Sequence, residues 1–363
     1  MDESAVSSGP EQATGDLPSA VSRRWRVQER MRRVFEQFGY RPIETPVLSR
    51  VEAVAGKYGP EAEQMMCVLN DAAGNRVSLP YDLTVPLVRY VAANAGRLPV
   101  PFKRYQVERV WRATPDRPGE FKEYHRCDID IIGSHSLVCE AEICRIVCDV
   151  LTGIGVGEFA IRFGENGVTD KVDFARFVRF CERLGVPDER IWFDPALTRE
   201  LDYYRGIVFE ISGPKQAGGS LCAGGRYEIA PGDNNNGPIV GVGVSFDLDR
   251  VLAAIGIGAP EAERDGVVLA LVLLPGSGQP EDPLELYREL IDEGISAEFH
   301  FEPGAPAEQL TDAARRGIPF AIRPANEPDP GGTVTVIRVD TGREKVIPRG
   351  QLTSYLKGYY ETR

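Results

Sequence analysis

The rhythm of apolar segments changes near residue 256, and this change constrains the fold more than any other feature. Before it, amphipathic helices, strands and glycine-rich connections follow one another in irregular order. After it, the apolar run Val267–Leu274 opens a regular alternation of strand and helix candidates. Such alternation predicts a small, mostly parallel α/β domain. The stretch Gly256–Arg264 between the two regions is small, polar and acidic, which indicates a linker.

The chain of 363 residues is long enough for two domains. Its first twenty residues are rich in Ser, Gly, Ala and Glu and lack the basic start and apolar core of a signal peptide. We therefore predict a disordered tail over residues 1–14, a first domain over 15–257 and a second domain over 265–363. No apolar run approaches the ~20 residues that span a bilayer, so we expect no membrane partner and a cytoplasmic location.

Periodicity predicts the elements of both domains. Apolar residues on one face indicate an amphipathic helix over 22–38, which Gly39 ends. Two strand candidates, Lys103–Arg112 and Tyr124–Gly133, flank a loop rich in Pro, Gly and Asp. Further helices are predicted over 84–95, 137–153, 172–184, 248–255, 283–293, 306–316 and 350–359. Further strands are predicted over 41–48, 207–211, 239–246, 267–274, 297–301, 319–323 and 333–339, with a hairpin joining 65–70 to 76–80 and a glycine-rich connection over 217–237.

Charge and side-chain chemistry narrow the possible functions. The net charge of −12 is unusual for a nucleic-acid-binding protein, although a local basic patch suffices for such binding. The densest basic cluster lies between Arg23 and Arg33, and we interpret it as the solvated face of a helix. Seven cysteines without a CxxC pair predict buried free thiols, and three histidines exclude a histidine-rich metal site. No metal-ligating residues are predicted.

The segment Glu108–Gly133 reads ERVWRATPDRPGEFKEYHRCDIDIIG. It resembles motif 2 of the class II aminoacyl-tRNA synthetases, which is a strand, a loop and a returning antiparallel strand. In that family the arginine at the position of Arg112 contacts the α-phosphate and the substrate carboxylate, and an aromatic residue at the position of Tyr124 stacks on adenine. A fixed cation suits this chemistry, because attack on the α-phosphate builds negative charge.

The most specific motif is LTRELDYYRGIVFE, Leu197–Glu210. It is similar to a segment of the histidyl-tRNA synthetase family, in which Arg199 matches the catalytic arginine. Tyr203 and Tyr204 match residues that line the histidine pocket, and so does Tyr227 in the segment AGGRYE. Without this resemblance, LDYY would be interpreted as a half-buried strand, since Tyr is a good strand former.

Other segments extend the resemblance over nearly the whole chain after residue 14. FGYRPIETPVL, Phe38–Leu48, resembles motif 1, which forms the dimer interface in class II synthetases. IVGVGVSFDLDRV resembles motif 3, in which the arginine at Arg250 contacts the γ-phosphate. In LPYDLTVPLVRY, Asp82 and Thr84 match residues that hold the α-amino group. Asp130 matches a carboxylate that faces the imidazole, and Arg126 lies beside the amino acid. Carboxylate partners suit both an ammonium group and an imidazole ring.

The resemblance implies a fold and a reaction. The expected fold is an antiparallel six-stranded catalytic domain with flanking helices, followed by a small α/β domain similar to an anticodon-binding domain. The expected reaction is ATP-dependent activation of histidine, or a close analogue, and transfer to tRNA by a homodimer. Arg112, Arg199 and Arg250 would stabilise phosphate charge, and Mg²⁺ would accompany ATP. Positioning and electrostatics suffice for this chemistry, so no nucleophilic side chain is required.

Several residues depart from the family pattern, mostly on the nucleotide side. Thr114 replaces an acid, Glu120 an arginine, Glu200 and Asp247 glycines, Pro80 an arginine and Arg126 a glutamine. Carboxylates a few ångströms from a triphosphate repel it by on the order of 1–4 kcal/mol each, so weaker ATP binding is expected. The helical insertion that helps to hold the tRNA acceptor arm in the family is much shortened here.

Two other functions remain open from the sequence. One is a specialised ligase that adenylates an amino acid for a protein or a small molecule, which Arg126 and the shortened insertion favour. The other is a non-catalytic regulatory subunit that senses histidine. The synthetase-like regulatory subunits of ATP phosphoribosyltransferase generally lack the C-terminal domain, which argues against this second reading.

Overall fold

The computed structural model describes residues 16–114, 121–166, 173–231, 237–255, 268–274, 276, 281–324 and 332–361. The chain divides into two compact units, Met1–Ala259 and Pro260–Arg363. The predicted tail over residues 1–14 and the predicted linker Gly256–Arg264 lie outside the described residues. Each unit has hydrophobic clusters of its own, as independent domains require.

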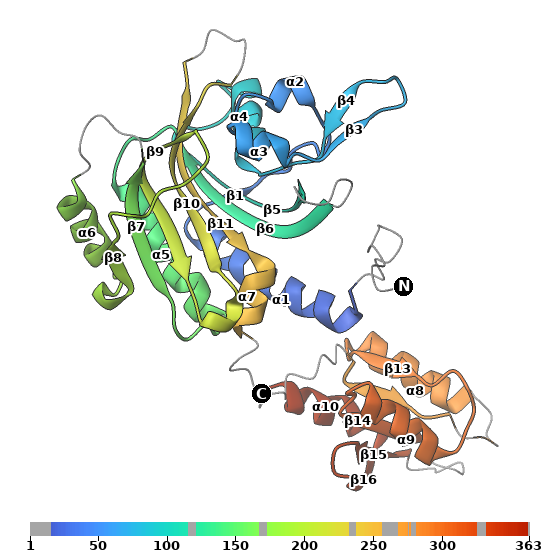
Figure 1. The fold of residues 1–363 in the computed structure, drawn as a ribbon. Coiled ribbons are helices and arrows are strands. Elements are labelled where there is room, and N and C mark those ends of the chain that lie inside the picture. Colours follow the sequence, from blue (N-terminus) through green and yellow to red (C-terminus); the bar gives the residue numbers. More distant parts are fainter. Residues whose placement is uncertain are drawn as a thin grey trace, which may run out of the picture. The chain divides into compact units, whose positions relative to one another are not determined.

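Eight strands form the main sheet of the first unit (Figure 1). Their order is β1-β5-β6-β11-β10-β9-β7-β8, and the six strands from β5 to β7 are antiparallel to their neighbours. The predicted six-stranded antiparallel sheet is thus confirmed. Two short edge strands extend it, because β1 and β8 pair in parallel with β5 and β7. The bounds are β1 (Arg41–Pro42), β5 (Phe102–Ala113), β6 (Phe121–Ile132), β7 (Ala160–Asn166), β8 (Ile191–Phe193), β9 (Tyr204–Ser212), β10 (Ser220–Ile229) and β11 (Ile239–Asp247).

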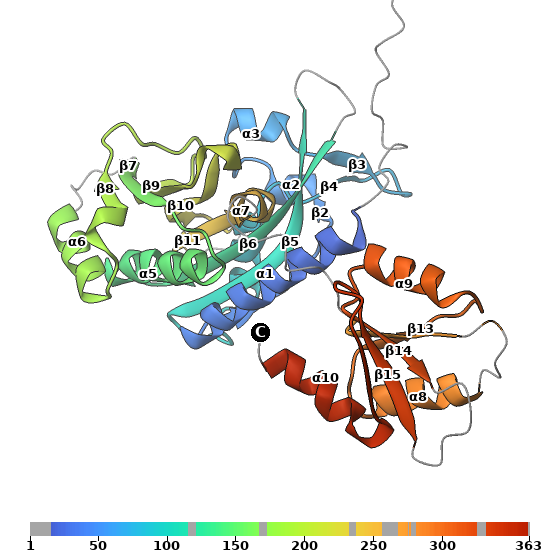
Figure 2. The same cartoon turned by 90° about the horizontal axis from the view of Figure 1, so that it is seen from below.

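Helices cover the two faces of this sheet. Helices α1 (Pro18–Gln37), α5 (Val138–Gly153) and α7 (Leu248–Ile255) share a hydrophobic core with one face (Figure 2), and α6 (Phe174–Arg183) packs on α5. The short helices α2 (Val51–Val54) and α3 (Pro60–Gln64) and the helix α4 (Thr84–Ala93) contribute to a second cluster on the other face. Only the ten-residue α6 is described as an α-helix between β7 and β9, which agrees with a shortened insertion.

Strand β6 shows how the sequence assigns side chains to these two faces. Cys127, Ile129 and Ile131 enter the core beneath α1 and α5. Successive residues of a strand point to opposite faces. The side chains of Arg126, Asp128 and Asp130 are therefore directed to the other face. Three ionisable residues of β6 are thus aligned on the face opposite this core.

Two predicted elements differ in the structure. A connection is predicted over 217–237, yet β10 begins at Ser220, because its glycines permit close strand contact. A Cβ atom on Gly224 would lie 2.0 Å from the carbonyl oxygen of Gly243 on β11. The strand predicted over 41–48 is limited to β1, since prolines at 42 and 46 lack the N–H groups that a ladder needs, and β2 (Ser49–Arg50) begins only after it.

The predicted hairpin is present as part of a three-stranded sheet. Strand β4 (Arg76–Ser78) lies between β3 (Val68–Asn70) and β2. The turn is formed by Asp71, whose Oδ1 accepts hydrogen bonds from the backbone N–H groups of residues 73 and 75 at 2.9 and 2.7 Å. Gly74 adopts a φ of 81° at the turn, a conformation that glycine adopts without steric cost.

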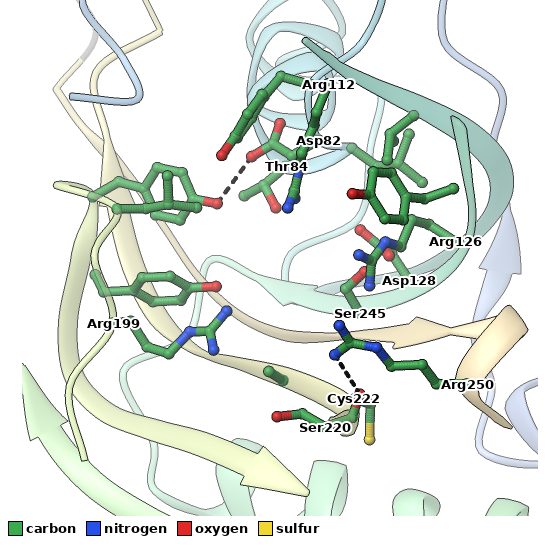
Figure 3. Close-up of a pocket in the computed structure, with 18 residues that line it drawn as sticks. Asp82, Thr84, Arg112, Arg126, Asp128, Arg199, Ser220, Cys222, Ser245 and Arg250 are labelled. Atoms are coloured by element: carbon green, nitrogen blue, oxygen red, sulfur yellow. Dashed lines mark hydrogen bonds between the residues drawn. The ribbon is translucent and has the colours of Figure 1, made fainter. Parts of the chain in front are cut away.

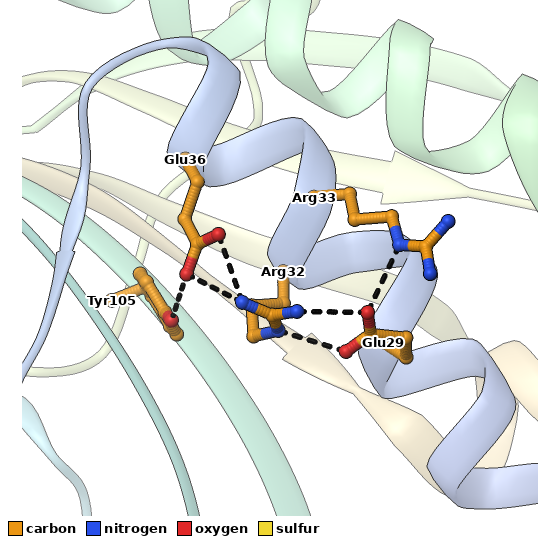
Figure 4. A network of polar contacts seen from close by, with 5 residues as sticks. All are labelled: Glu29, Arg32, Arg33, Glu36 and Tyr105. Atoms are coloured by element: carbon orange, nitrogen blue, oxygen red, sulfur yellow. Dashed lines mark hydrogen bonds and ion pairs between the residues drawn. The ribbon is translucent and has the colours of Figure 1, made fainter.

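Two arginines of the basic cluster pair with acids of the same helix α1 (Figure 4). Arg32 donates hydrogen bonds to Glu29 and Glu36 at 2.8 Å, and Arg33 donates to Glu29 at 2.9 Å. These arginines lower the pKa of Glu29 to about 2. The interpretation as a solvated helix face holds for this pair. It is wrong for Arg24, which is buried and pairs with Asp16.

The second unit is a five-stranded sheet with order β13-β12-β14-β15-β16. Strand β12 is parallel to β13 and β14, whereas β15 is antiparallel to both of its neighbours, so the predicted mostly parallel sheet is only half parallel. The missed strand β16 is exposed and lacks apolar alternation. The bounds are β12 (Ala270–Val272), α8 (Glu281–Asp292), β13 (Ala297–Phe299), α9 (Pro306–Arg315), β14 (Phe320–Pro324), β15 (Thr333–Arg338), β16 (Glu344–Pro348) and α10 (Leu352–Glu361).

The cysteines carry no disulfide. All seven are free, and six are buried, which confirms the prediction of buried free thiols. Burial raises the thiol pKa of Cys127, Cys144 and Cys222, so these groups stay protonated and unreactive. None of the helices in the described part of the chain combines the length and apolar character needed to cross a membrane.

We predict that Gly243→Ala destabilises the fold by about 1–3 kcal/mol, because the added Cβ atom overpacks a closed site. That atom would lie 2.1 Å from Oδ1 of Asp130 and 2.6 Å from the carbonyl oxygen of Ile129. The matched control is Gly153→Ala at the end of α5, where no atom lies within 4 Å, and where alanine stabilises a helix by up to about 1 kcal/mol. Urea denaturation measures both, and equal midpoints would contradict the packing argument.

Candidate active site

A cavity of about 240 Å³ lies on the face of the main sheet opposite α1 and α5. Nine residues that the sequence predicts for the site line this cavity: Asp82, Thr84, Arg112, Tyr124, Arg126, Arg199, Tyr203, Tyr204 and Arg250. They come from β5, β6, the residues at and just before the start of α4, the start of β9 and the segment before it, and the helix α7. The sheet therefore brings together residues that lie more than 160 positions apart in the sequence.

Asp82 lines the cavity beside Thr84 and Arg112 (Figure 3). Its Oδ2 accepts a hydrogen bond from the Tyr203 hydroxyl at 2.9 Å, and its Oδ1 accepts bonds from the Tyr58 hydroxyl at 3.2 Å and the Val85 N–H at 3.1 Å. Burial raises the pKa of Asp82 to about 6, although these donors oppose the shift. The three donors favour the ionised form of Asp82 and fix the carboxylate in place.

Three predicted arginines enter the cavity from separate elements (Figure 3). The Arg112 guanidinium lies 4.5 Å from the centre of the Tyr81 ring and 5.5 Å from that of Tyr124. Arg199 is anchored through its backbone, whose N–H donates to Asn166 at 3.0 Å. The Nε atoms of Arg112 and Arg199 are buried and lack a hydrogen-bond partner among the described residues, so donors remain for an anionic ligand.

Arg250 and Arg126 share a carboxylate. Nη2 of Arg126 lies 3.3 Å from Oδ2 of Asp247, and Nε of Arg250 lies 3.6 Å from the same oxygen. Asp247 also caps α7, because its Oδ1 accepts the Arg250 N–H at 3.2 Å. Residues 126 and 247 are directly opposite each other on β6 and β11. Two departures from the family pattern are thus partners in one ion pair.

Two predicted residues do not line the cavity. Asp130 and Tyr227 are buried, and the tyrosine hydroxyl donates to Oδ1 of the aspartate at 2.7 Å. The other oxygen, Oδ2, lies 2.6 Å from Nη2 of the fully buried Arg104. Gly241 and Gly243 of β11 leave the space that these side chains occupy. Both oxygens of Asp130 thus have protein partners in this structure, and its predicted role toward the imidazole stays a prediction.

A second cavity of about 600 Å³ adjoins the first through Tyr81, Arg112, Arg199 and Leu201. Glu200, one of the departures from the family pattern, lines this second cavity and is exposed. Thr114 directly follows β5 and is partly buried, and Glu120 lies outside the described residues. The added acid at 200 therefore borders the 600 Å³ cavity rather than the 240 Å³ cavity.

Sequence reasoning missed other residues that line the first cavity. Asp128, Ser220, Cys222 and Ser245 all face it. The position of Asp128 could have been predicted from the sequence, because it lies two residues from Arg126 and so shares its strand face. The described residues include no group of three His, Cys, Asp or Glu side chains placed to hold a metal ion. We therefore assign no protein ligands to a magnesium ion.

Comparison with known proteins agrees with this geometry. The family model described as histidyl-tRNA synthetase matches residues 14–177 and 171–251, and the model described as anticodon binding domain matches residues 270–359. A histidine–tRNA ligase from Treponema denticola is 29% identical, with 84% of this chain and 86% of the relative covered.

Two solved structures share the fold. The histidyl-tRNA synthetase of Nostoc sp. PCC 7120 superimposes with a TM-score of 0.81 at 23% identity, covering 99% of this chain and all of that one. A structure from Bacillus halodurans C, described as an ATP phosphoribosyltransferase regulatory subunit/histidyl-tRNA synthetase, gives a TM-score of 0.71 at 19% identity, covering 89% and 99%. Since the family model spans most of the first unit and the arginines of its motifs line one cavity, the chain belongs to the histidyl-tRNA synthetase family, within the class II aminoacyl-tRNA synthetases.

Proposed function

We propose that the protein activates histidine with ATP to form histidyl-adenylate and transfers the histidyl group to tRNA. The observation that carries this proposal is one cavity that Asp82 lines together with Arg112, Arg199 and Arg250. A carboxylate suits the ammonium group of an amino acid, whereas arginines suit its carboxylate and the nucleotide phosphates. The ligase relatives and the anticodon-binding-domain match support tRNA as the acceptor.

The proposed first step is an in-line displacement. A carboxylate oxygen of the amino acid attacks the α-phosphorus, the bond from that phosphorus to the bridging oxygen breaks, and pyrophosphate leaves. Negative charge on the α-phosphate oxygens increases in the transition state, and the arginine side chains offset it. In the second step a ribose hydroxyl of tRNA attacks the acyl carbon, loses its proton, and AMP leaves. Magnesium would enter bound to the phosphates of ATP.

The ion pair between Arg126 and Asp247 changes the expected effect of the added acid. A carboxylate at 247 that lacked a partner would repel a triphosphate. Here the Asp247 side chain is 4% exposed and forms ion pairs with two guanidinium groups, which offset its negative charge. The remaining effect is volume, because Arg126 and Asp247 occupy space beside the Tyr124 ring, whose centre lies 5.4 Å from the Arg126 guanidinium.

The proposed dimer uses the segment around Pro46. Val47 and Leu48 are 40% and 55% exposed, and Leu48 borders a groove of about 450 Å³ whose other walls include Pro86 and Tyr90 of α4. Adjacent exposed apolar side chains beside a hollow are typical of a surface that another chain covers. A second copy is the occupant that the motif 1 resemblance predicts.

We predict that histidine, among the standard amino acids, supports ATP–pyrophosphate exchange, and that Arg112→Gln lowers the exchange rate about 10²- to 10³-fold. The control is Arg109→Gln on the same strand, which is 52% exposed, pairs with Glu123 and does not line the cavity. Histidine binding by calorimetry without exchange would replace the proposal with a sensing role. Exchange without charging of tRNA would point to another acceptor.

We predict that Arg126 and Asp247 act as a unit in a double-mutant cycle. Asp247→Asn keeps a capping oxygen for α7 and removes the charge, and Arg126→Gln removes the partner. Each single variant leaves one partly buried charge less compensated, so the double variant should lose less stability than the two losses added. The coupling should be about 0.5–3 kcal/mol in urea denaturation. Strict additivity would show that the pair is a chance contact.

We predict that the protein is a dimer at micromolar concentration and that Leu48→Asp shifts it to a monomer. A charge in an apolar interface loses its hydration without gaining a partner. The control Ile291→Asp changes an apolar residue of the second unit that is 45% exposed. Light scattering of the unmodified protein at the 39.9 kDa mass of one chain would exclude the dimer.

A further inference from the structure

Asp128 is a buried carboxylate at the edge of the active-site cavity, and neither the motifs nor the proposed reaction uses it. It lies on β6 between Arg126 and Asp130, on the strand face that they share. Its exposed fraction is 5%, yet it lines the 240 Å³ cavity (Figure 3). The register places it opposite Gln106 of β5 and Ser245 of β11.

The hydrogen bonds of Asp128 are incomplete. Its Oδ1 is buried and has no donor among the described residues. Asp130, two residues along the same strand face, differs in this respect, because Tyr227 and Arg104 contact its two oxygens at 2.7 and 2.6 Å. A buried carboxylate oxygen without a donor is costly for the fold. Its retention at the wall of a cavity is explained if a ligand supplies the donor.

The surrounding charges indicate which ligand group fits. Arg126, the nearest arginine on the strand, has its shortest ion pair with Asp247 at 3.3 Å rather than with Asp128. Asp82 lines the same cavity, and the charge of Asp128 contributes to the raised pKa of Asp82. Burial raises the pKa of Asp128, and Arg104 and a hydrogen bond from Ser245 oppose the shift, so a further donor from a ligand would stabilise its charged form. An ammonium group has three donors and no acceptor, so it suits a cavity that two carboxylates line.

We propose that Asp128 is a substrate-binding residue whose free oxygen accepts a hydrogen bond from the α-ammonium group of the amino acid. This inference rests on the proposed function, because it assigns part of the same substrate. It adds a specificity element, since a ligand without an amine would leave Oδ1 of Asp128 unpaired. Discrimination is strong where a missing ligand group leaves a buried polar atom without a partner.

The test compares Asp128→Asn and Asp130→Asn with two ligands. The ligands are histidine and 3-(imidazol-4-yl)propanoate, which lacks the amine. Asp128→Asn should bind histidine about 10- to 100-fold more weakly, since the ligand bond is to a charged group. The same variant should bind the amine-free acid about as well as the unmodified protein does. Equal losses for both ligands, or no loss for histidine, would overturn the proposal.

Thermal unfolding without ligand provides a second readout that a purely structural role would move in the opposite direction. Asp128→Asn should keep or raise Tm, because it removes a buried charge that lacks a full set of partners, and it should reduce the Tm shift caused by histidine. Asp130→Asn should lower Tm, because it breaks the ion pair with Arg104. A lowered Tm for Asp128→Asn, with an unchanged histidine shift, would make Asp128 structural.

These outcomes also separate the inference from the proposed function. If the unmodified protein binds histidine and Asp128→Asn binds it equally well, only the role of Asp128 is lost. If the unmodified protein binds no histidine at millimolar concentration, the proposed function and this inference both fall.

Discussion

The ion pair between Arg104 and Asp130 is the contact on which the floor of the site depends. Arg104 is fully buried, and the two residues are directly opposite each other on β5 and β6. A buried charge that loses its partner is costly, by about 3–5 kcal/mol, because no water replaces the missing group. The pair therefore favours one register of the hairpin, and this register places Arg112 and Tyr124 of the same strands at the cavity wall.

The glycines of the neighbouring strands make that floor possible. Asp130 and Tyr227 extend across β11 only because residues 241 and 243 have no side chains, and a Cβ atom at either position would overlap them. Arg104, Asp130 and Tyr227 contact one another and fill the floor of the site. The side chains that line the cavity therefore determine which ligand it can bind. Four arginines and two aspartates line the cavity, so the field favours an anionic ligand that also carries a cationic group. An amino acid together with a nucleotide has this combination.

Elements and site residues that depend on a local pattern could be predicted from the sequence. Those that depend on contacts with distant residues could not. The long antiparallel hairpin and the arginines at 112, 199 and 250 follow from periodicity and motif resemblance. Strand β10 does not, because the same glycines that suggest a loop serve close approach to β11. The burial of Asp130 also escapes prediction, since it depends on a partner 26 positions away whose alignment is set only when the strands pair. The position of Asp128 could have been predicted, because the alternation of side chains along a strand places it on the same face as Arg126.

The case of Asp247 shows why residue-by-residue comparison with a family misjudges charge. If Asp247 is considered alone, an acid in place of glycine beside a nucleotide site predicts repulsion of the triphosphate. The residue opposite it on β6 is also a departure, from glutamine to arginine, and the two side chains meet at 3.3 Å. The net charge of this pair is zero, and the cap on α7 gives the carboxylate a second function. An acid repels the triphosphate only if no nearby cation offsets its charge. Among the described residues that depart from the family pattern, the exposed Glu200 at the adjoining cavity is such an acid. Since exposed charges are screened by water and salt, the phosphate-binding arginines need not be outweighed, and adenylate formation remains electrostatically feasible despite the net charge of −12.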